Sequence, residues 1–597
     1  TAFGLASGCT FDGKYIANVD LLPVFESPTA GAGYAYNGLL ANWSLNSTSP
    51  LINQGDPQTA ALFDIPSTDF KGNKRIRYAV IDQGAIEFSR NAITVNTDIV
   101  TNTVWYADTV KVTDSILVAD NAKLTIWPGV KVIFDGPYAL TVEGVLDARG
   151  TPEDRIVFTC RDTSGFAANR LSTFTSWKGI RIDNSIDGRM YNNDTTRLAW
   201  CDIEYVHTNK HKGIDGAVYI NNFQKVIIEN CRIAHNTGRF KAGIQMVHSS
   251  DIIFRNNEVF DNKTILLQPF YSKGAGCYVY NADPQFYNNR IYNNSSCVNG
   301  SGLCCENSNG VFYNNSIVNN ISVEDGGGIY LSDCDLALCF NNLIANNQSD
   351  SGRAGGIYIY GSFRYCYNNT IANNKSMLPG GGIHANGNTI NVYNTIVYGN
   401  IPNQLHLGNY LMTLNLINND IEGGKPGFTY SNNPLYYAID MTGSIDLKPH
   451  FKNPTSNAGA AYNALQAAFS LLDISFCINK GNNTISGITL PEKDITGNTR
   501  IQNNTIDIGA YENSGHSPVF TQKPLAGSYC NGDSIILTAR ASDTVFYQWR
   551  KEGRIILGAE SDTLLITNAA SGNTGNYSCD ITNAYGVTQS EAVLIQV

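Results

Sequence analysis

The chain has 597 residues, of which 15% are charged and 43% are hydrophobic, and it contains 55 glycines and 32 tyrosines. Its formal net charge of −10 disfavours electrostatic binding to nucleic acid or to an anionic membrane surface. No run of 18 apolar residues occurs, so the sequence predicts no membrane-spanning helix.

Much of residues 1–90 is repeated near the end of the chain. VDLLPVFESPTAGAGYAYNGL at Val19–Leu39 aligns with IDLKPHFKNPTSNAGAAYNAL at Ile445–Leu465. The alignment resumes with DFKGNKRI at Asp69–Ile76 against DITGNTRI at Asp494–Ile501, and it ends with IDQGAIE against IDIGAYE. The offset is 426 and then 425 residues, which indicates that one large unit has been duplicated.

Short β-strands are predicted from about Asn91 onwards. Runs that alternate apolar and polar residues occur at Thr109–Val112, Ser115–Val118, Lys123–Trp127, Val130–Phe134, Leu140–Leu146 and Ile156–Thr159. Pro128-Gly129 and Gly150-Thr151-Pro152 mark turns between them.

One phrase is then written nine times between Trp200 and Ile421, each copy centred on an aliphatic residue that is usually flanked by asparagines. The centres are Ile203, Ile233, Val259, Ile291, Ile317, Ile344, Ile371, Ile396 and Ile421, 25 to 32 residues apart, which is typical of a solenoid. A glycine-rich phrase such as GGGIY keeps step with the first. Because one strand cannot bury a face alone, stacked coils must supply the core. We therefore predict a parallel β-helix. It lacks the hexapeptide period of the left-handed form.

The asparagines of this phrase are interpreted as structural. Six lie three residues before their centres: Asn230, Asn256, Asn288, Asn314, Asn341 and Asn368. Stacked coils would place their amides about 4.8 Å apart, within reach of one another along the axis. We expect these six residues to form a hydrogen-bonded ladder.

The repeated terminal segment resembles a known ending. SPLINQG at Ser49–Gly55, DFKGNKR and IDQGAIE, with their later copies, resemble the C-terminal segment of right-handed, pectate-lyase-like β-helix proteins of the secreted Bacteroidota surface-protein type. LTIWPGVKVIF and WKGIRI resemble the first coils of the same family. The resemblance implies that residues 1–90 are the C-terminal cap of a preceding β-helix, so that the parent chain extends N-terminally. It also implies that residues 91–513 are a complete right-handed β-helix whose own plug covers its last coil.

Residues 516–597 resemble an immunoglobulin-like β-sandwich. In this resemblance Trp549 is the core tryptophan, and Tyr577, two residues before Cys579, is the tyrosine corner. Ala539 stands where the first cysteine of the inter-sheet disulfide is expected, and Cys530 lies nine residues earlier. The disulfide is therefore in doubt. The fold class expected for the whole chain is all-β: a right-handed parallel β-helix followed by an Ig-like sandwich.

The other cysteines suggest stacking between coils. Cys201 with Cys231 and Cys339 with Cys366 hold equivalent positions, and Cys297, Cys304, Cys305 and Cys334 cluster on adjacent coils. Disulfides and buried thiol columns are both compatible with this spacing.

Catalytic candidates gather in three longer turns. His207, Lys210, His211, His235 and Arg239 are the catalytic candidates, accompanied by Asp215, Lys241, Lys263, Phe270 and Tyr271. Such residues could supply the base of a polysaccharide lyase. No known lyase spacing or paired-aspartate signature recurs, so a solvated polar rim is the favoured interpretation.

Two further sets could bind ligands. Glu324, Asp325, Asp333 and Asp335 are weak Ca²⁺ candidates that lack the pattern of a calcium loop. The residue after each glycine-rich phrase should point outward. This gives a stripe of Tyr219, Gln245, Tyr278, Cys304, Tyr330, Tyr358 and His384, whose tyrosines are the candidate binders of sugar rings or of a protein. Aromatic columns also stabilise β-helices without any ligand.

These features favour a secreted or cell-surface adhesive or structural protein made of tandem β-helix units. The partners would be other surface proteins or polysaccharides, with no nucleic acid and no cofactor other than possible Ca²⁺. Two alternatives stay open: a polysaccharide lyase or glycoside hydrolase, and a non-catalytic glycan-binding protein.

Overall fold

The structure is a computed structural model, and it is all-β. It describes residues 22–46, 49–52, 66–72, 75, 81–88, 92–163, 176–184, 194–208, 215–265, 272–296, 298–361, 363–408, 412–485, 487–502, 504–542 and 544–597. The chain divides into two compact units, residues 1–178 with 194–204, and residues 179–193 with 205–597. Helical segments in the described ranges are three-residue 3₁₀ turns, and none is long and apolar enough to cross a membrane.

The first compact unit opens with an antiparallel pair, β1 (Phe25–Ser27) and β2 (Asn42–Leu45), followed by stacked parallel strands. One row contains β3 (Ile93–Val95), β5 (Thr109–Val112), β8 (Lys131–Phe134), β11 (Ile156–Cys160) and β14 (Cys201–Glu204). A second contains β4 (Thr103–Trp105), β7 (Lys123–Ile126), β10 (Val145–Arg149) and β13 (Thr196–Ala199), and β6 (Ile116–Val118) pairs with β9 (Leu140–Val142). The predicted strand Leu140–Leu146 is split at Gly144, where a Cβ would lie 2.2 Å from two backbone oxygens.

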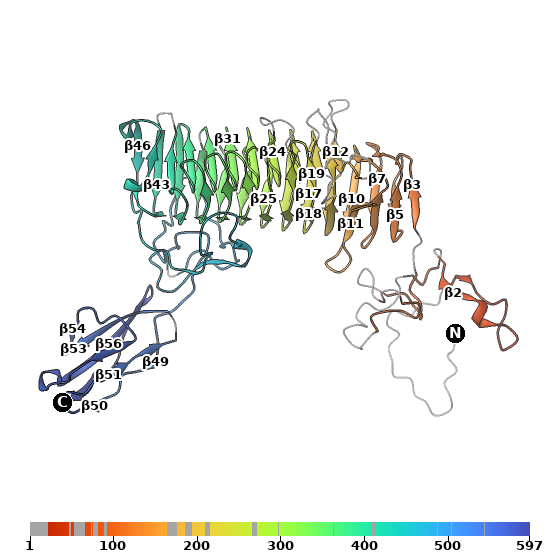
Figure 1. Cartoon of the computed structure of the whole chain (residues 1–597). Coiled ribbons are helices and arrows are strands. Elements are labelled where there is room, and N and C mark those ends of the chain that lie inside the picture. The colour runs from red at the N-terminus through yellow and green to blue at the C-terminus, as the bar shows by residue number, and fades with distance from the viewer. Residues whose placement is uncertain are drawn as a thin grey trace. The chain divides into compact units, whose positions relative to one another are not determined.

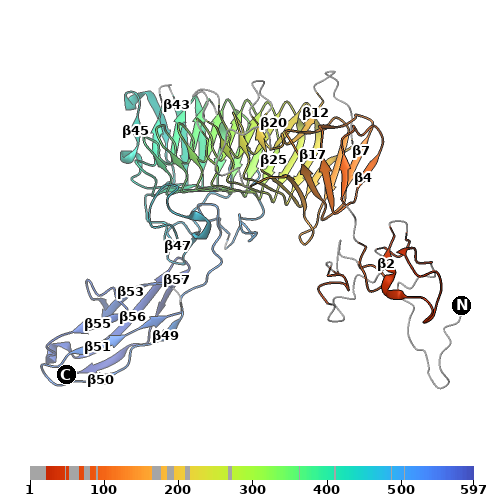
Figure 2. The same cartoon turned by 45° about the vertical axis from the view of Figure 1, so that its right-hand side comes forward.

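The second compact unit stacks its coils in three parallel rows (Figures 1 and 2). The first row is β12 (Ile180–Asp183), β16 (Val218–Asn221), β20 (Ile244–Val247), β24 (Cys277–Tyr280), β27 (Leu303–Glu306), β31 (Ile329–Ser332), β35 (Ile357–Tyr360), β39 (Ile383–Asn386), β42 (Leu405–Leu407) and β45 (Thr429–Tyr430). The second row is β17 (Gln224–Glu229), β21 (Ser250–Arg255), β25 (Gln285–Tyr287), β28 (Val311–Tyr313), β32 (Leu338–Phe340), β36 (Phe363–Tyr367), β40 (Thr389–Tyr393), β43 (Met412–Ile417) and β46 (Tyr437–Asp440).

The third row carries the asparagine-flanked phrase. It is β18 (Arg232–Ala234), β22 (Glu258–Phe260), β26 (Arg290–Tyr292), β29 (Ser316–Val318), β33 (Leu343–Ala345), β37 (Thr370–Ala372), β41 (Ile396–Tyr398) and β44 (Asp420–Ile421). Two short sheets lie beside it: β15 (His207–Thr208), β19 (Thr237–Gly238) and β23 (Lys263–Thr264), and β30 (Ile321–Ser322), β34 (Gln348–Ser349) and β38 (Lys375–Ser376). The predicted parallel β-helix is thus confirmed.

The predicted register holds over most of the third row. Ile233, Val259, Ile291, Ile317, Ile344 and Ile371 follow one another in direct pairing. Ile371 then pairs with Val397 and not with Ile396, so the eighth predicted centre is wrong by one residue. Because neighbouring residues of a strand face opposite sides, Val397 points into the coil and Ile396 points outward.

Apolar side chains and two buried asparagine ladders fill the coils. The apolar part includes Phe254, whose ring stacks on that of Phe286 at 4.7 Å, and Phe312, whose ring is tilted against Phe286 at 5.8 Å. Asn257, Asn289, Asn315, Asn342 and Asn369 form one ladder, and Asn236, Asn262, Asn294, Asn320, Asn347, Asn374 and Asn400 form the other. In each, the amide Nδ2 donates to the amide oxygen one coil on, at 2.9 to 3.1 Å.

The six asparagines expected to form the ladder hold a different position. Asn230, Asn256, Asn288, Asn314, Asn341 and Asn368 have φ between 54° and 57°, in the left-handed region that asparagine tolerates. This turn directs the next residue into the coil. The first ladder runs through the asparagine that follows each of the last five, whereas Cys231 follows Asn230 and donates its backbone N–H to Asn257. The prediction was therefore displaced by one residue.

The described cysteines are free thiols, and all except Cys530 are buried. Cys339 pairs in register with Cys366, as predicted. The Sγ atoms of Cys305 and Cys334 lie 3.6 Å apart. Cys297 lies outside the described residues. These contacts favour thiol columns over disulfides in the described part of the solenoid.

The C-terminal domain is a β-sandwich formed by β49 (Phe520–Gln522), β50 (Gly527–Ser528), β51 (Ile535–Thr538), β52 (Arg540–Ala541), β53 (Phe546–Lys551), β54 (Arg554–Ile555), β55 (Thr563–Ile566), β56 (Gly575–Asn583), β57 (Gly586–Gln589) and β58 (Val593–Gln596). Trp549 is fully buried and pairs with Cys579, and Ala539 packs in the same core. The Tyr577 hydroxyl donates to the Asn573 carbonyl at 2.9 Å, as a tyrosine corner does.

Candidate functional site

The predicted tyrosine stripe is aligned but largely covered. Its members pair in register along the first row, from Tyr219 to His384. Yet Tyr219, Tyr278 and Tyr358 are only 7 to 8% exposed, and Cys304 is fully buried. These residues therefore do not present open ring faces, and among the members of the stripe only Tyr330 is partly exposed.

Turns that contain glycine cover the outer face of the stripe. A Cβ on Gly274, Gly300 or Gly326 would lie 3.0 Å or less from a Cβ of the stripe residues Tyr278, Cys304 or Tyr330, and all three glycines have positive φ. The turns that precede β24, β27 and β31 thus fold back onto the outer face of the first row. Glycine is required because a side chain would neither tolerate this φ nor fit this approach.

The stripe extends beyond the predicted residues at both ends. Arg181 pairs with Tyr219 at one end, and His384 pairs with His406 at the other. The guanidinium of Arg181 lies 5.9 Å from the Tyr219 ring centroid and donates to the Gly216 carbonyl at 3.2 Å. Arg181 was missed, although GIRI at Gly179–Ile182 repeats the glycine-apolar phrase one coil earlier.

Asp215 and Lys241 lie next to this end of the stripe. Asp215 is buried, and its Oδ2 accepts from the backbone N–H of Phe240 at 2.9 Å. The Nζ of Lys241 lies 4.4 Å from the Tyr278 ring centroid and 5.9 Å from that of Phe240. It forms no hydrogen bond or ion pair with any residue that the structure describes. Burial lowers the pKa of Lys241 and raises the pKa of Asp215.

The next coils close a polar network. Glu306 accepts from Lys273 Nζ at 2.5 Å and from the Tyr278 hydroxyl at 2.8 Å, and neither Glu306 nor Lys273 belonged to the predicted site set. Both oxygens of Glu306 are thus engaged within the protein. Lys241 differs because, among the described residues, its amine contacts only aromatic rings. It is therefore the group in this region that could exchange a proton with a ligand.

Three of the predicted catalytic residues, His207, His235 and Arg239, lie in the described part of the chain, and each has its own partners. His207 is buried, and its Nδ1 lies 2.8 Å from the Thr237 hydroxyl. His235 is half-exposed, stacks on Tyr205 and lies 3.8 Å from Asp261. Arg239 packs over Phe240 at 5.0 Å, and Lys263 lies in β23. Lys210, His211, Phe270 and Tyr271 lie outside the described residues.

The weak calcium candidates are separated by a strand. Glu324 and Asp325 precede β31, whereas Asp333 and Asp335 follow it. Asp325 already accepts from the backbone N–H of Arg353 at 2.7 Å, and Asp333 accepts from the Ser332 hydroxyl at 2.9 Å. The structure therefore does not bring the four carboxylates together. Among the residues it describes, no group of three His, Cys, Asp or Glu side chains could hold a metal ion.

Acid should weaken the solenoid through the histidine end of the stripe. His384 and His406 stack at 5.0 Å, and burial, with Arg353 nearby, lowers the pKa of His406 to about 4. Between about pH 6.5 and about pH 4, His406 therefore binds a proton in the unfolded chain but not in the folded chain. We expect the free energy of unfolding to fall as pH falls through that window, by about 2 kcal/mol from this residue after allowance for solvent screening.

This prediction is checked as a difference between variants. Asp420, whose pKa burial raises to about 6, changes stability in the opposite sense over the same range. Denaturant unfolding of His406→Asn should therefore be compared with wild type at each pH, with exposed His516→Asn as the control. Equal pH dependence in wild type and His406→Asn would contradict the assignment.

A second surface is built by the left-handed asparagines that end the second-row and third-row strands, called here the corner asparagines. After the third row, Asn319 donates to the carbonyls of Ala460 and Tyr462, and Asn346 donates to those of Asn457 and Gly459, at 2.7 to 3.1 Å. After the second row, Asn341 donates to the Lys493 carbonyl at 2.8 Å. Asn373, Asn394 and Asn418 bind the same C-terminal segment, residues 445–513.

Between these two lines of asparagines the segment covers the outer face of the third row. Val318, Leu343, Ala345 and Ala372 pack against Ala464 and Phe469, and Ile396 packs with Leu471, Cys477, Ile478 and Ile508. The segment includes β47 (Phe451–Asn453) and β48 (Ala468–Leu471). Its contacts run along the side of the coils, which differs from the expected cover over the last coil.

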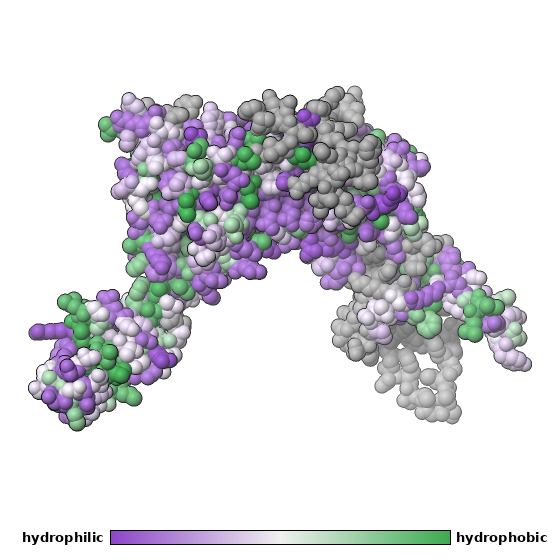
Figure 3. Space-filling view, in the orientation of Figure 1, coloured by the Kyte–Doolittle hydropathy of each residue, from purple (hydrophilic) through white to green (hydrophobic). Residues whose placement is uncertain are grey.

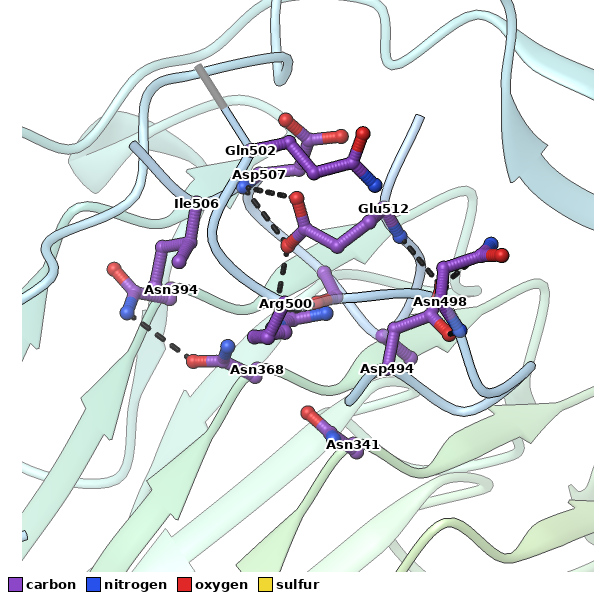
Figure 4. A network of polar contacts seen from close by, with 12 residues as sticks. Asn341, Asn368, Asn394, Asp494, Asn498, Arg500, Gln502, Ile506, Asp507 and Glu512 are labelled. Atoms are coloured by element: carbon purple, nitrogen blue, oxygen red, sulfur yellow. Dashed lines mark hydrogen bonds and ion pairs between the residues drawn. The ribbon is translucent and has the colours of Figure 1, made fainter. Parts of the chain in front are cut away.

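A buried ionic cluster fixes the end of the segment (Figure 4). Arg500 is fully buried, and its Nε lies 3.2 Å from Glu512 Oε1. Glu512 donates its backbone N–H to Asp494 and accepts from the backbone N–H of Asp507. With the Asn368 amide in the orientation that satisfies its neighbours, its oxygen accepts from the Arg500 guanidinium. Burial raises the pKa of Glu512 to about 9, and Arg500 opposes that shift.

Sequence reasoning also missed an outer aromatic column. Tyr287, Tyr313, Phe340 and Tyr367 stack with centroids 4.7 to 4.9 Å apart on the second row. The signal was present, since an aromatic residue precedes each asparagine pair in FYNNR, FYNNS, CFNNL and CYNNT. Because the rings face one another, their faces are already occupied.

Residues 156–298 and 217–421 match the family model described as right handed beta helix region, and residues 517–597 match the model for an immunoglobulin domain. Similarity searches find no curated protein that matches the chain. Solved structures that match include the Ig1-2 module of the Drosophila receptor protein tyrosine phosphatase DLAR, at 24% identity over 15% of this chain and 52% of that one, with a TM-score of 0.13. The titin M3 domain matches at 24% identity, over 14% of this chain and 98% of the other, with the same TM-score. The tandem Ig repeats of Dlar match at 25% identity with a TM-score of 0.13, over 13% of this chain and about half (47%) of theirs. The two family models show that the chain contains a right-handed β-helix region and an Ig-like domain.

Proposed function

We propose that this protein is secreted or displayed on the cell surface, where tandem β-helix units and an Ig-like module serve an adhesive or structural role. The observation that carries the proposal is the pair of asparagine ladders, which continue from coil to coil without a break for a catalytic cleft among the described residues. Satisfied buried amides of this kind stiffen a solenoid. Ig-like modules are frequent spacers and binding units outside the cell.

Location and role can be tested on native cells. Protease treatment of intact cells should release fragments of this chain, and the full chain immobilised on beads should retain surface proteins or polysaccharides of its environment. Recovery of the protein in the cytoplasm alone, protected from protease, would contradict the proposal. The glycan-binding alternative has less support because Tyr219, Tyr278 and Tyr358 do not offer open ring faces.

A polysaccharide lyase or hydrolase is the second candidate, and Lys241 is the observation that favours it. A lysine with a lowered pKa carries more neutral, basic amine near neutral pH. If the site is catalytic, Lys241→Met should lower turnover at least a hundredfold. Turnover is measured as unsaturated products at 235 nm and as reducing ends, with a panel of polysaccharides. Lys131→Met, at the exposed first residue of β8, is the matched control. Absence of turnover in wild type leaves the adhesive or structural role.

The same substitution gives a stability test. Lys241 is desolvated but has no hydrogen-bond partner among the described residues, so methionine at this position should be neutral or stabilise the fold by about 1 kcal/mol. A gain in the denaturant midpoint would mark a residue kept for function at a cost in stability. A loss of more than about 1 kcal/mol would instead assign Lys241 a structural role.

A further inference from the structure

The described residues between Leu22 and Phe88 repeat features of the C-terminal segment. β1 pairs with β2 as β47 pairs with β48, and the rings of Phe25 and Trp43 meet edge to face at 5.4 Å as do those of Phe451 and Phe469. Asn37 caps its 3₁₀ turn through the backbone N–H of Leu39, as Asn463 does through that of Leu465.

The ionic cluster is repeated as well. Arg75 lies 2.9 Å from Glu87 and donates to the Gly84 carbonyl, as Arg500 does toward Glu512 and Gly509. The backbone N–H of Glu87 donates to Asp69 at 2.8 Å, and that of Glu512 donates to Asp494 at the same distance. Both segments therefore carry the same internal framework, and their outward faces can be compared position by position.

The C-terminal copy uses that face to dock on the third row. Phe469 is 1% exposed among Val318, Leu343, Ala345 and Ala372. The backbone N–H of Ala510 donates to the Thr370 hydroxyl at 3.0 Å, and that of Gly509 donates to the Asn394 carbonyl at 2.8 Å. The backbone N–H of Ala464 donates to the corner asparagine Asn319 at 2.9 Å.

The N-terminal copy leaves the equivalent face open. Trp43 corresponds to Phe469 but is 42% exposed, and Leu39, which corresponds to Leu465, is 95% exposed. Gly84 and Ala85, which correspond to the buried Gly509 and Ala510, are exposed. Hydrophobic residues gather on the surface around β2 in Figure 3. A large exposed apolar face on a well-formed module indicates an interaction site.

We propose that the face of Leu39, Trp43, Phe70, Gly84 and Ala85 docks on the side of a second parallel β-solenoid, on a strand row bordered by corner asparagines. The contacts of the docked copy specify the occupant. It must offer small apolar side chains to Trp43, a hydroxyl to the backbone N–H of Ala85 and a corner-asparagine carbonyl to that of Gly84. It must also offer a corner asparagine to Arg75. The row of this chain from Val318 to Ile396 is already covered by its own segment. The N-terminal face therefore serves as the joint to another solenoid unit.

This inference rests on the tandem-unit part of the proposed function, and a segment exchange within the full chain tests it separately. In the chimera, Val24–Glu87 replaces His450–Glu512, so that the N-terminal segment is offered the third row of this solenoid. We expect the transplanted segment to dock. Its cleavage rate in limited proteolysis should then lie within about threefold of the rate for the native segment in wild type. Trp43→Asp in the transplanted copy should raise the cleavage rate at least tenfold, as Phe469→Asp should in the native chain.

Two results would overturn the inference. One is a chimera whose transplanted segment is cleaved as fast as the segment in Phe469→Asp. The other is a protected chimera that is indifferent to Trp43→Asp, because the apolar face would then not be the docking surface. Neither result would bear on surface exposure of the protein in the native cell, which the protease treatment of intact cells measures.

Discussion

Replacing Asn294 with alanine should lower the free energy of unfolding of the coils around it by about 3 to 5 kcal/mol. The Asn294 amide oxygen accepts from the backbone N–H and the side-chain amide of Asn262, and its Nδ2 donates to the Val259 carbonyl and to Asn320. Alanine would leave several of these buried groups without a partner, at roughly 1 to 3 kcal/mol each. The neighbouring ladder amides cannot replace these hydrogen bonds because each is already hydrogen-bonded within the ladder.

The adjacent residue supplies the control. Asn293 has φ of 55° and an exposed side chain, so Asn293→Gly keeps the turn and removes no buried hydrogen bond. It should change stability by less than about 0.5 kcal/mol. Because a solenoid can open locally, native-state hydrogen exchange in β22, β26 and β29 should accompany denaturant unfolding. Equal losses in Asn293→Gly and Asn294→Ala would contradict the role of the inner ladder.

Replacing Arg500 with methionine should loosen the C-terminal segment by about 3 kcal/mol or more. The substitution removes the partner of buried Glu512 and the donor to Asn368 and to the Gly509 carbonyl. Leaving one member of a buried pair unpaired is far costlier than losing an exposed pair. Limited proteolysis of residues 480–513 should accelerate while the coils themselves stay folded.

The Arg500→Met variant should also gain a distinctive pH dependence. Without Arg500 the folded-state pKa of Glu512 rises further above its unfolded value, so the folded chain holds a proton that the unfolded chain releases. The stability of the segment should therefore keep falling as pH rises above about 9, where the wild-type contribution of Glu512 levels off. Lys493→Met, at an exposed residue of the same segment, should follow the wild-type curve. A variant that tracks wild type at every pH would show that the pair does not fix the segment.

The coil architecture could be predicted from the sequence because it depends on local pattern. Alternation of apolar and polar residues defines strands, and a repeated phrase fixes which strands pair, since register is set by which residues must face the core. Among the centres from Ile233 to Ile421 the register failed at Ile396, where NTIV in place of NNxI conceals the shift. Thr395 takes the ladder position there. The core tryptophan and tyrosine corner of the C-terminal domain were predicted from its resemblance to an immunoglobulin-like sandwich, in which each has a fixed place in a short motif.

Only the tertiary structure decided which of these residues are accessible and what they contact. Asn293 and Asn294 are the same residue type in the same phrase, and it is the positive φ of the first that turns one amide outward and the other into the ladder. Tyr278 alternates outward as predicted, yet Gly274 folds a turn of the same coil over it. Phe469 and Trp43 occupy matching positions in a duplicated segment, but one is buried against the third row and the other is exposed. The sequence determined which side of a strand each residue faces, whereas burial depends on segments distant in sequence that pack against that side.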